Sequence, residues 1–199
     1  MSDPAGWRHL AGYLSTDQQA ALLAGIRTVI SGAPLYPPTM PRTGKPFSVR
    51  MTNCGPLGWV SDATGGYRYQ ATHPVTGQSW PSMPTALVKL WERVTGYPAC
   101  PEACLVNYYA ASAKMGSHRD EDEEDKAAPV VSISLGDDAS STSAASGAAT
   151  PSSGSFSDRA TCSYSAVQRA SPTTASTAFT PAPRACCPRV AASTSLCDG

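Results

Sequence analysis

The sequence predicts an α+β fold in which helices buttress an antiparallel sheet. Two observations indicate this class: two amphipathic helical patterns, and a run of short strand patterns after the second of them. At 199 residues the chain is long enough for one domain with a real core.

The first helix is predicted to begin at a capping box, because Ser15 is followed three residues later by Gln18. Its apolar face comprises Leu22, Leu23, Ile26, Val29 and Ile30. The proline-rich residues 34–46 predict a loop or extended lid, which also holds Arg42, Gly44 and Lys45.

Pro84 suits the first turn of a second helix that ends at Gly96. The apolar face of this helix is Leu87, Leu90, Trp91 and Val94. Strand candidates follow at Cys104–Tyr109, around His118, and at Val130–Leu135.

Composition excludes some classes of function. The formal net charge is zero, so nothing global indicates a nucleic-acid or membrane surface. No apolar run approaches the roughly 20 residues of a membrane span, and the first residues do not resemble a secretion signal. We therefore expect a cytoplasmic protein, monomeric and without a membrane partner, whose seven cysteines are reduced and unpaired.

The chain changes character near Ala139. From residue 140 to 199, Ser, Ala and Thr make up 35 of 60 residues, and the stretch contains no Lys, His, Glu, Ile or Trp. Such a segment buries too little apolar surface to offset its ordering entropy. The sequence therefore predicts two regions, a domain over 1–139 and a low-complexity, disordered tail over 140–199.

His118-Arg119-Asp120 is the sharpest chemical feature of the sequence. Residues two apart on a strand share a face, so the imidazole and the carboxylate could occupy two corners of a 2-His-1-carboxylate iron site. The tripeptide alone is weak evidence for an iron site, because most such tripeptides are ordinary surface residues.

The surrounding motifs strengthen that interpretation. The strings MTNCGPLGW, CLVNYYAASAKMGSHRDEDE and APVVSISLG occur in this order. Together they resemble the AlkB family of Fe(II)- and 2-oxoglutarate-dependent dioxygenases, over about residues 47–138. The resemblance implies a double-stranded β-helix (jelly-roll) core, with Fe(II), 2-oxoglutarate and dioxygen as cofactor and co-substrates.

The resemblance also implies roles for individual residues. His118 and Asp120 match two iron ligands, and residues 107–109 match the strand that contacts 2-oxoglutarate. Those three residues are Asn107, Tyr108 and Tyr109. The implied substrate-binding residues are Trp59, Tyr67, Arg68, Tyr69 and Asp122.

The implied substrate is an alkylated base in single- or double-stranded DNA, with RNA as a further option. Lesions such as 1-methyladenine and 3-methylcytosine are cationic, so aromatic faces and a carboxylate suit them, and the base must be flipped out of the duplex. The methyl carbon is hydroxylated and lost as formaldehyde.

Plainer interpretations stand beside these roles. Trp59, Tyr67 and Tyr69 could be ordinary core aromatics. In the acidic run 120–125 we expect only Asp120 and Asp122 to be functional. His9 and His73 lie in no matching motif, so we expect them to be structural or exposed.

The sequence departs from the family pattern in its last third. The family needs a further His ligand in an H-G context and C-terminal arginines that pair with 2-oxoglutarate. No His follows His118, and the terminal motif is absent. About half of the jelly-roll strands would then be missing or disordered, and we expect little or no turnover.

Three functions follow from this pattern. The first is oxidative demethylation of alkylated bases in DNA, impaired in this chain. The second is a catalytically dead remnant that still binds nucleic acid. The third is an Fe(II)/2-oxoglutarate oxygenase that acts on RNA, protein or a small molecule.

A frameshift near Ala139 would explain the tail. If its codons are read from their third base, residues 170–175 permit Leu-Ala-Tyr-His-Gly, and residues 192–199 permit Ile-Asn-Leu-Thr-Leu-Arg-Arg. Both are the missing family motifs, in the right order. The alternative is a natural disordered tail, which the composition allows.

We expect the gene to carry an inserted or deleted base near codon 139. Sequencing codons 135–145 from independent genomic DNA is the measurement. An uninterrupted reading frame through this window contradicts the frameshift and leaves the natural tail.

Overall fold

The computed structural model describes residues 7–110, 113–115, 128–135, 162–165 and 188–193. Its elements are β1 (Trp7–Leu10), α1 (Thr16–Gly32), β2 (Arg50–Cys54), β3 (Gly58–Asp62), β4 (Gly66–Gln70), α2 (Thr85–Thr95), β5 (Cys104–Tyr109), β6 (Val130–Leu135), β7 (Cys162–Ser165) and β8 (Pro188–Ser193).

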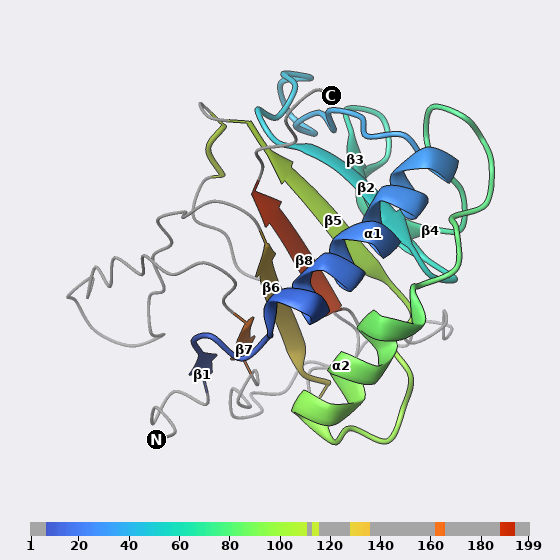
Figure 1. Cartoon of the computed structure of the whole chain (residues 1–199). Helices are drawn as coiled ribbons and strands as arrows, with labels where there is room; N and C mark the ends of the chain where they lie inside the picture. Colours follow the sequence, from blue (N-terminus) through green and yellow to red (C-terminus); the bar gives the residue numbers. More distant parts are fainter. Residues whose placement is uncertain (1–6, 111–112, 116–127, 136–161, 166–187, 194–199) are drawn as a thin grey trace, which may run out of the picture.

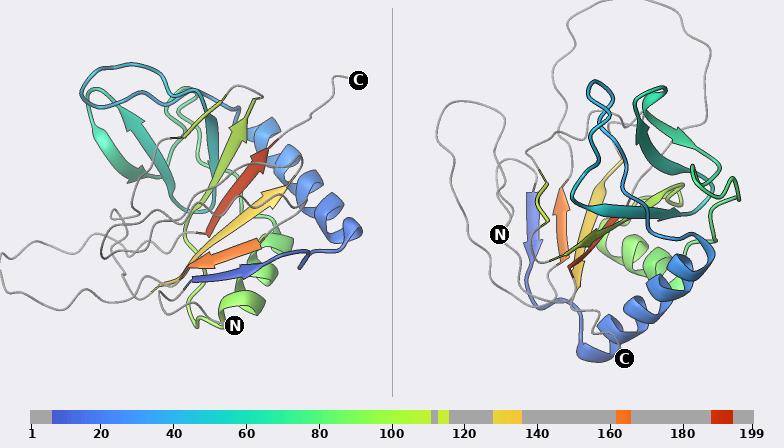
Figure 2. Two further views of the ribbon diagram at one scale, coloured as in Figure 1. Left: turned by 90° about the vertical axis from the view of Figure 1, so that its left-hand side faces the viewer. Right: turned by 90° about the horizontal axis from the view of Figure 1, so that it is seen from above.

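The fold has three layers. Helices α1 and α2 cover one face of a six-stranded sheet with the order β1-β7-β6-β8-β5-β2 (Figure 1). The β3–β4 hairpin forms a separate two-stranded sheet on the other side (Figure 2). The predicted α+β class is therefore confirmed.

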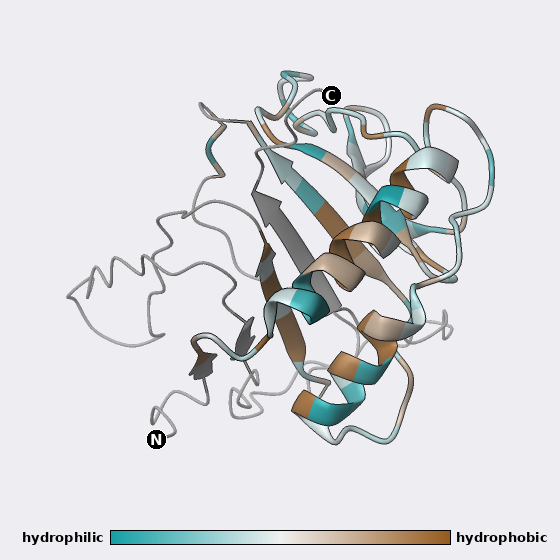
Figure 3. Cartoon of the chain, viewed as in Figure 1, coloured by the Kyte–Doolittle hydropathy of each residue, from teal (hydrophilic) through white to brown (hydrophobic). Residues whose placement is uncertain are grey.

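Helix α1 begins at the predicted capping box, and α2 ends at Gly96 as the sequence predicts. Ser15 Oγ accepts a hydrogen bond from the Gln18 N–H at 3.3 Å, and Gln18 Oε1 accepts from the Ser15 N–H at 2.9 Å, which completes the capping box. Pro84 is the N-cap of α2, and Gly96 ends it in the left-handed region at φ 61°. Figure 3 shows separate apolar and polar bands on α2, as an amphipathic helix has. Within the described residues, no helix is long and apolar enough to cross a membrane.

The strands are only partly as predicted. β5 and β6 have the expected bounds, whereas the candidate strand around His118 lies outside the described residues. Three strands that were not predicted, β2 to β4, lie between the two helices. The simple order of helices followed by strands is therefore wrong.

The C-terminal region contributes two strands. β7 pairs antiparallel with β1 and β6, and β8 lies between β5 and β6, parallel to both. These two strands lie within residues 140–199, whose predicted disorder stays a prediction. The sheet is mixed rather than antiparallel. The remainder of residues 140–199 lies outside the described part of the chain.

Two apolar clusters fill the space on either side of the sheet. The helix side holds Leu14, Leu22, Ile26, Val29, Cys54, Leu87, Leu90, Trp91, Cys104, Val106, Val131, Ile133 and Leu135. The hairpin side holds Val49, Met51, Trp59 and Leu105, with Phe47, Tyr69, Tyr109 and Ala113 packed against them. Alternation along β5 explains this division, because Leu105 and Val106 point to opposite faces.

Two neighbouring residues of β2 tie these layers together. Thr52 Oγ1 donates to the Ala33 carbonyl at the end of α1, at 2.8 Å. Asn53 points to the other face and bonds to β3. The outer edge of β2 is covered in part by Tyr36, which exchanges two backbone hydrogen bonds with Met51, of 3.0 and 2.8 Å.

Truncating Ile26 tests the helix–sheet core. Ile26 is 1 % exposed, so Ile26→Ala leaves a cavity and should lower the free energy of unfolding by about 2–5 kcal/mol. Arg27→Ala, on the exposed side of the same turn, should change it by less than about 0.5 kcal/mol. Urea unfolding of both variants is the measurement, and equal losses would contradict this packing.

Candidate functional site

The β3–β4 hairpin carries most of the predicted substrate-binding residues. Trp59 pairs with Tyr69 and Ser61 with Tyr67 across the two strands. Because side chains alternate, Trp59, Tyr67 and Tyr69 share one face, and Arg68 lies on the other. The structure therefore groups the three aromatic residues and separates Arg68 from them.

The aromatic face forms a continuous stack. The ring centroids of Trp59 and Tyr67 are 5.6 Å apart with an interplanar angle of 22°. Phe47 stacks on Trp59 at 6.5 Å and 21°. Trp59 is 9 % exposed and Tyr67 is 53 % exposed, so Trp59 anchors the stack and Tyr67 presents it to solvent.

Asn53 holds Trp59 in place from below. Its Nδ2 donates to the Trp59 carbonyl at 2.9 Å, and its Oδ1 accepts from the Trp59 N–H at 3.0 Å. The neighbouring Gly58 admits this close approach, because a Cβ there would lie 2.5 Å from Trp80 Cε2 and 2.7 Å from Asn53 Cβ. The backbone of Trp59 is thus fixed by a fully buried amide.

The reverse face of the hairpin packs on a buried aromatic group. Val60 lies in a cluster with Ala33, Tyr36 and Trp80. Burial raises the pKa of Tyr36 far above its usual value, so its hydroxyl stays protonated. The hairpin is therefore packed on both faces, at Val60 and at Trp59, whereas Tyr67 near the turn is exposed.

His73 completes this anchoring group. Its Nε2 lies 2.7 Å from the Pro34 carbonyl, and its Nδ1 accepts from the N–H groups of Val75 and Thr76 at 3.1 and 3.2 Å. This pattern assigns the proton to Nε2 and leaves neither ring nitrogen for a metal. The expectation that His73 is structural is confirmed, whereas nothing is described for the side chain of His9.

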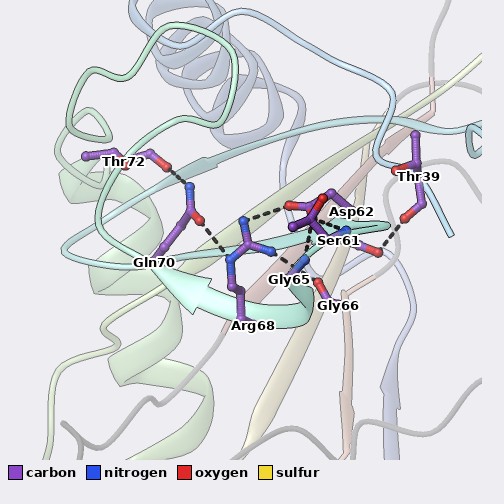
Figure 4. Close-up of polar contacts among 9 residues, drawn as sticks. Thr39, Ser61, Asp62, Gly65, Gly66, Arg68, Gln70 and Thr72 are labelled. Carbon is purple, nitrogen blue, oxygen red and sulfur yellow. Dashed lines mark hydrogen bonds and ion pairs between the residues drawn. The ribbon is translucent and has the colours of Figure 1, made fainter. Parts of the chain in front are cut away.

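Charged residues close the end of the hairpin (Figure 4). Arg68 Nη2 lies 2.7 Å from Asp62 Oδ2. Asp62 Oδ1 accepts from the N–H groups of Thr64 and Gly65 at 2.9 and 2.6 Å. The hydrogen bond from the Gly65 N–H, followed by the one from Arg68, lowers the pKa of Asp62 below its usual value.

The predicted 2-oxoglutarate residues are divided by alternation along β5. Asn107 and Tyr109 share the hairpin-side face with Leu105, and Tyr109 packs on the same cluster as Trp59. Tyr108 belongs to the opposite face, where the Arg50 guanidinium lies 4.6 Å from its ring centroid. The structure thus brings Asn107 and Tyr109 towards the aromatic stack and directs Tyr108 away.

The side chain of Asn107 shows whether this region suits a polar ligand. It is 5 % exposed, and its Oδ1 is buried without a hydrogen-bond partner among the described residues. An amide can exchange its oxygen and nitrogen by rotation, so either a donor or an acceptor can be presented. A buried polar group of this kind fits a site for a small ligand such as 2-oxoglutarate.

The predicted iron ligands His118 and Asp120, and the predicted base contact Asp122, lie outside the described residues. Over residues 7–110, 113–115, 128–135, 162–165 and 188–193, no group of three His, Cys, Asp or Glu side chains could hold a metal ion. Their roles stay predictions.

Three residues of this region were not singled out from the sequence: Phe47, Asn53 and Asp62. Asn53 lies inside the string MTNCGPLGW, so its motif was noticed but its role was not. Phe47 and Asp62 stand in no pattern that would mark them, because their partners are distant or across a turn.

Comparison with protein-family models decides the family. Residues 6–157 match the model described as the 2OG-Fe(II) oxygenase superfamily. The chain belongs to the 2OG-Fe(II) oxygenase superfamily. The match includes His118 and Asp120 and continues past residue 139, where the composition changes.

Relatives within the superfamily are AlkB proteins. The chain is 49 % identical over 130 residues to an alpha-ketoglutarate-dependent dioxygenase AlkB homolog of Caulobacter vibrioides, covering 64 % of this chain and 57 % of the relative. It is 44 % identical over 119 residues to alpha-ketoglutarate-dependent dioxygenase AlkB of Escherichia coli, covering 58 % and 54 %. The resemblance to the AlkB family is confirmed, and the chain matches a little over half the length of these relatives.

A solved structure supports the fold. OsALKBH1 superposes with a TM-score of 0.60 at 21 % identity, covering 83 % of this chain and 81 % of that one. The superfamily fold, with helices against a sheet, is therefore shared.

Removing the Asn53 amide tests the anchoring of Trp59. Asn53→Ala removes two buried hydrogen bonds to the Trp59 backbone, and it should cost about 1–3 kcal/mol of unfolding free energy more than Asn107→Ala. Asn107→Ala is the matched control, since it removes a buried amide whose Oδ1 has no described partner. Urea unfolding measures both, and equal costs would count against this role of Asn53.

Proposed function

We propose that this chain is an Fe(II)- and 2-oxoglutarate-dependent dioxygenase that demethylates alkylated bases in DNA. Its turnover is low in this polypeptide. The observation that carries the proposal is the exposed Tyr67 ring stacked on a buried, braced Trp59. The family membership supplies the chemistry that this surface would serve.

The aromatic pair suits a cationic methylated base. A flat ring with positive charge is attracted to the electron-rich faces of Trp and Tyr, and stacking on such faces contributes about 1–3 kcal/mol per base. Tyr67 is more than half exposed, so one of its faces can meet a base that has left the duplex. Asp122 would add a negative charge, as the resemblance implies.

Asn107 and Tyr109 would hold 2-oxoglutarate. Both lie on the hairpin-side face of β5, and Tyr109 packs on the cluster that contains Trp59. His118 and Asp120 would bind the iron. When bound, iron and 2-oxoglutarate supply the activation of dioxygen, while this chain's own residues orient the base and exclude water from the reacting methyl group.

We expect low turnover because the chain has too few His side chains that could bind the iron. The chain has three His residues: His9, His73 and His118. Both ring nitrogens of His73 are occupied by backbone groups, so it does not offer the second His ligand. His9 lies in no motif that matches the family, so we do not assign it as a ligand. A site with His118 and Asp120 alone would bind iron weakly.

A second candidate follows from the same observation. If the iron site is incomplete, the chain would still bind alkylated nucleic acid through the aromatic stack without chemistry. DNA and RNA both present such bases, so the stack does not separate them.

The full chain should bind a single-stranded oligonucleotide with one 3-methylcytosine more tightly than the unmodified one. Tyr67→Ala should weaken the binding of the methylated oligonucleotide by about 1–3 kcal/mol. Tyr13→Ala is the control, because it removes another exposed tyrosine, beside Arg93 of α2. Fluorescence anisotropy measures the binding, and equal affinity for both oligonucleotides would contradict the proposal.

Turnover is measured in the same preparations. With Fe(II), 2-oxoglutarate and the methylated oligonucleotide, we expect little succinate and formaldehyde. Rapid release of both products in equal amounts would show that the iron site is complete and would exclude the binding remnant.

A further inference from the structure

Each of the three guanidinium nitrogens of Arg68 has a partner within the hairpin. Its Nη2 pairs with Asp62, its Nε donates to Gln70 Oε1 at 3.0 Å, and its Nη1 donates to the Gly66 carbonyl at 3.3 Å. It also lies against Gly65, where any Cβ would collide with it. Figure 4 shows these contacts around the turn that joins β3 to β4.

The contacts continue to the segments on either side of the hairpin. Gln70 Nε2 donates to the Thr72 carbonyl at 2.6 Å. On β3, Ser61 Oγ donates to the Thr39 carbonyl at 2.6 Å, and the Thr39 N–H donates to the Ser61 carbonyl at 3.1 Å. The end of the hairpin is thus held by its own turn and by the loop at residue 39.

We propose that Arg68 is a positioning residue, which through its pair with Asp62 holds Tyr67 over Trp59, and that it is not a contact for the nucleic-acid backbone. The part of this inference that concerns bound nucleic acid rests on the proposed function. The resemblance to the AlkB family places Arg68 in the substrate-binding segment, so the inference separates it from its two tyrosine neighbours.

The position of Tyr67 explains why such a residue is needed. Tyr67 follows Gly66, which has φ 67°, and it is the second residue after the turn. It is exposed on the side away from Trp59, so the direction of its ring depends on the backbone of the turn. Arg68 fixes that backbone from the opposite face, because it bonds to Gly66 and to Asp62 on the facing strand.

The charge of Arg68 is also matched locally. Asp62 lies 2.7 Å from the guanidinium, and the two side chains are 37 % and 34 % exposed. A phosphate would have to compete with a carboxylate that already neutralises the charge of Arg68. The geometry therefore favours an internal role over a phosphate contact.

Two substitutions isolate the ion pair. Asp62→Asn keeps an Oδ1 that can accept from the Thr64 and Gly65 N–H groups, and it replaces the charged Oδ2 that faces Arg68 with an uncharged NH2 group, which cannot accept from the guanidinium. Arg68→Gln removes the other partner. Arg27→Gln is the matched control, because Arg27 is an exposed arginine on α1, across the sheet from the hairpin.

The first readout needs no ligand. The ring-proton NMR resonances of Tyr67, assigned with Tyr67→Phe, report its stacking on Trp59. Asp62→Asn and Arg68→Gln should move these resonances in the same direction, towards those of a solvent-exposed tyrosine. The double variant should resemble each single variant. Unchanged resonances in Asp62→Asn would overturn the inference.

The second readout is binding of the 3-methylcytosine oligonucleotide at several salt concentrations. Both variants should bind about two- to fivefold more weakly, the effect of a partly exposed ion pair, with an unchanged salt dependence. A phosphate contact predicts otherwise: Arg68→Gln would reduce the slope of log K against log salt by about 0.7, and Asp62→Asn would tighten binding. Either of those results overturns the inference, and Arg27→Gln should have no effect.

The two readouts separate this inference from the proposed function. If the unsubstituted chain does not prefer the methylated oligonucleotide, the proposed function fails. The Tyr67 resonances still decide whether Arg68 positions the ring.

Discussion

The placement of Thr52 and Asn53 on opposite faces of β2 is the constraint on which the rest of the structure depends. Both side chains are fully buried, one bonding to the end of α1 and the other to the backbone of Trp59. Adjacent residues of a strand must point to opposite faces, so a single dipeptide fixes the helix layer and the hairpin layer relative to one sheet. Because polar groups at these depths must be paired, neither layer can slide without breaking a buried hydrogen bond.

The sequence predicted the elements whose patterns are local. The capping box at Ser15, the left-handed Gly96 and the bounds of β5 and β6 all follow from a few neighbouring residues. β2 and β3 escaped because they are buried along almost their whole length and show no alternation of polar and apolar residues. The parallel insertion of β8 between β5 and β6 depends on pairing across long separations, which no local pattern encodes.

The candidate site divides along the same line. Family resemblance placed Trp59, Tyr67 and Tyr69 in one segment, and the register of β3 and β4 puts them on one face. The same register turns Arg68 the other way, and alternation on β5 does the same for Tyr108, so a residue list taken from a motif mixes two faces. Asn53 is in no list of predicted site residues, yet its side chain fixes the backbone of Trp59 and so the place of the aromatic stack. The predicted iron ligands His118 and Asp120 lie outside the described residues, so their role stays a prediction.

The bridge between Tyr36 and Met51 has a consequence for the behaviour of the protein in solution. β2 is the last strand of the six-stranded order, and at Met51 its outward backbone groups are paired with Tyr36. An uncovered strand at a sheet margin is a template on which another polypeptide can add. Tyr36 also packs with Val60 and Trp80 behind the hairpin, so loosening of the hairpin would weaken the cover as well. The aromatic group behind the hairpin thereby also covers part of a sheet edge on which a second polypeptide could otherwise add.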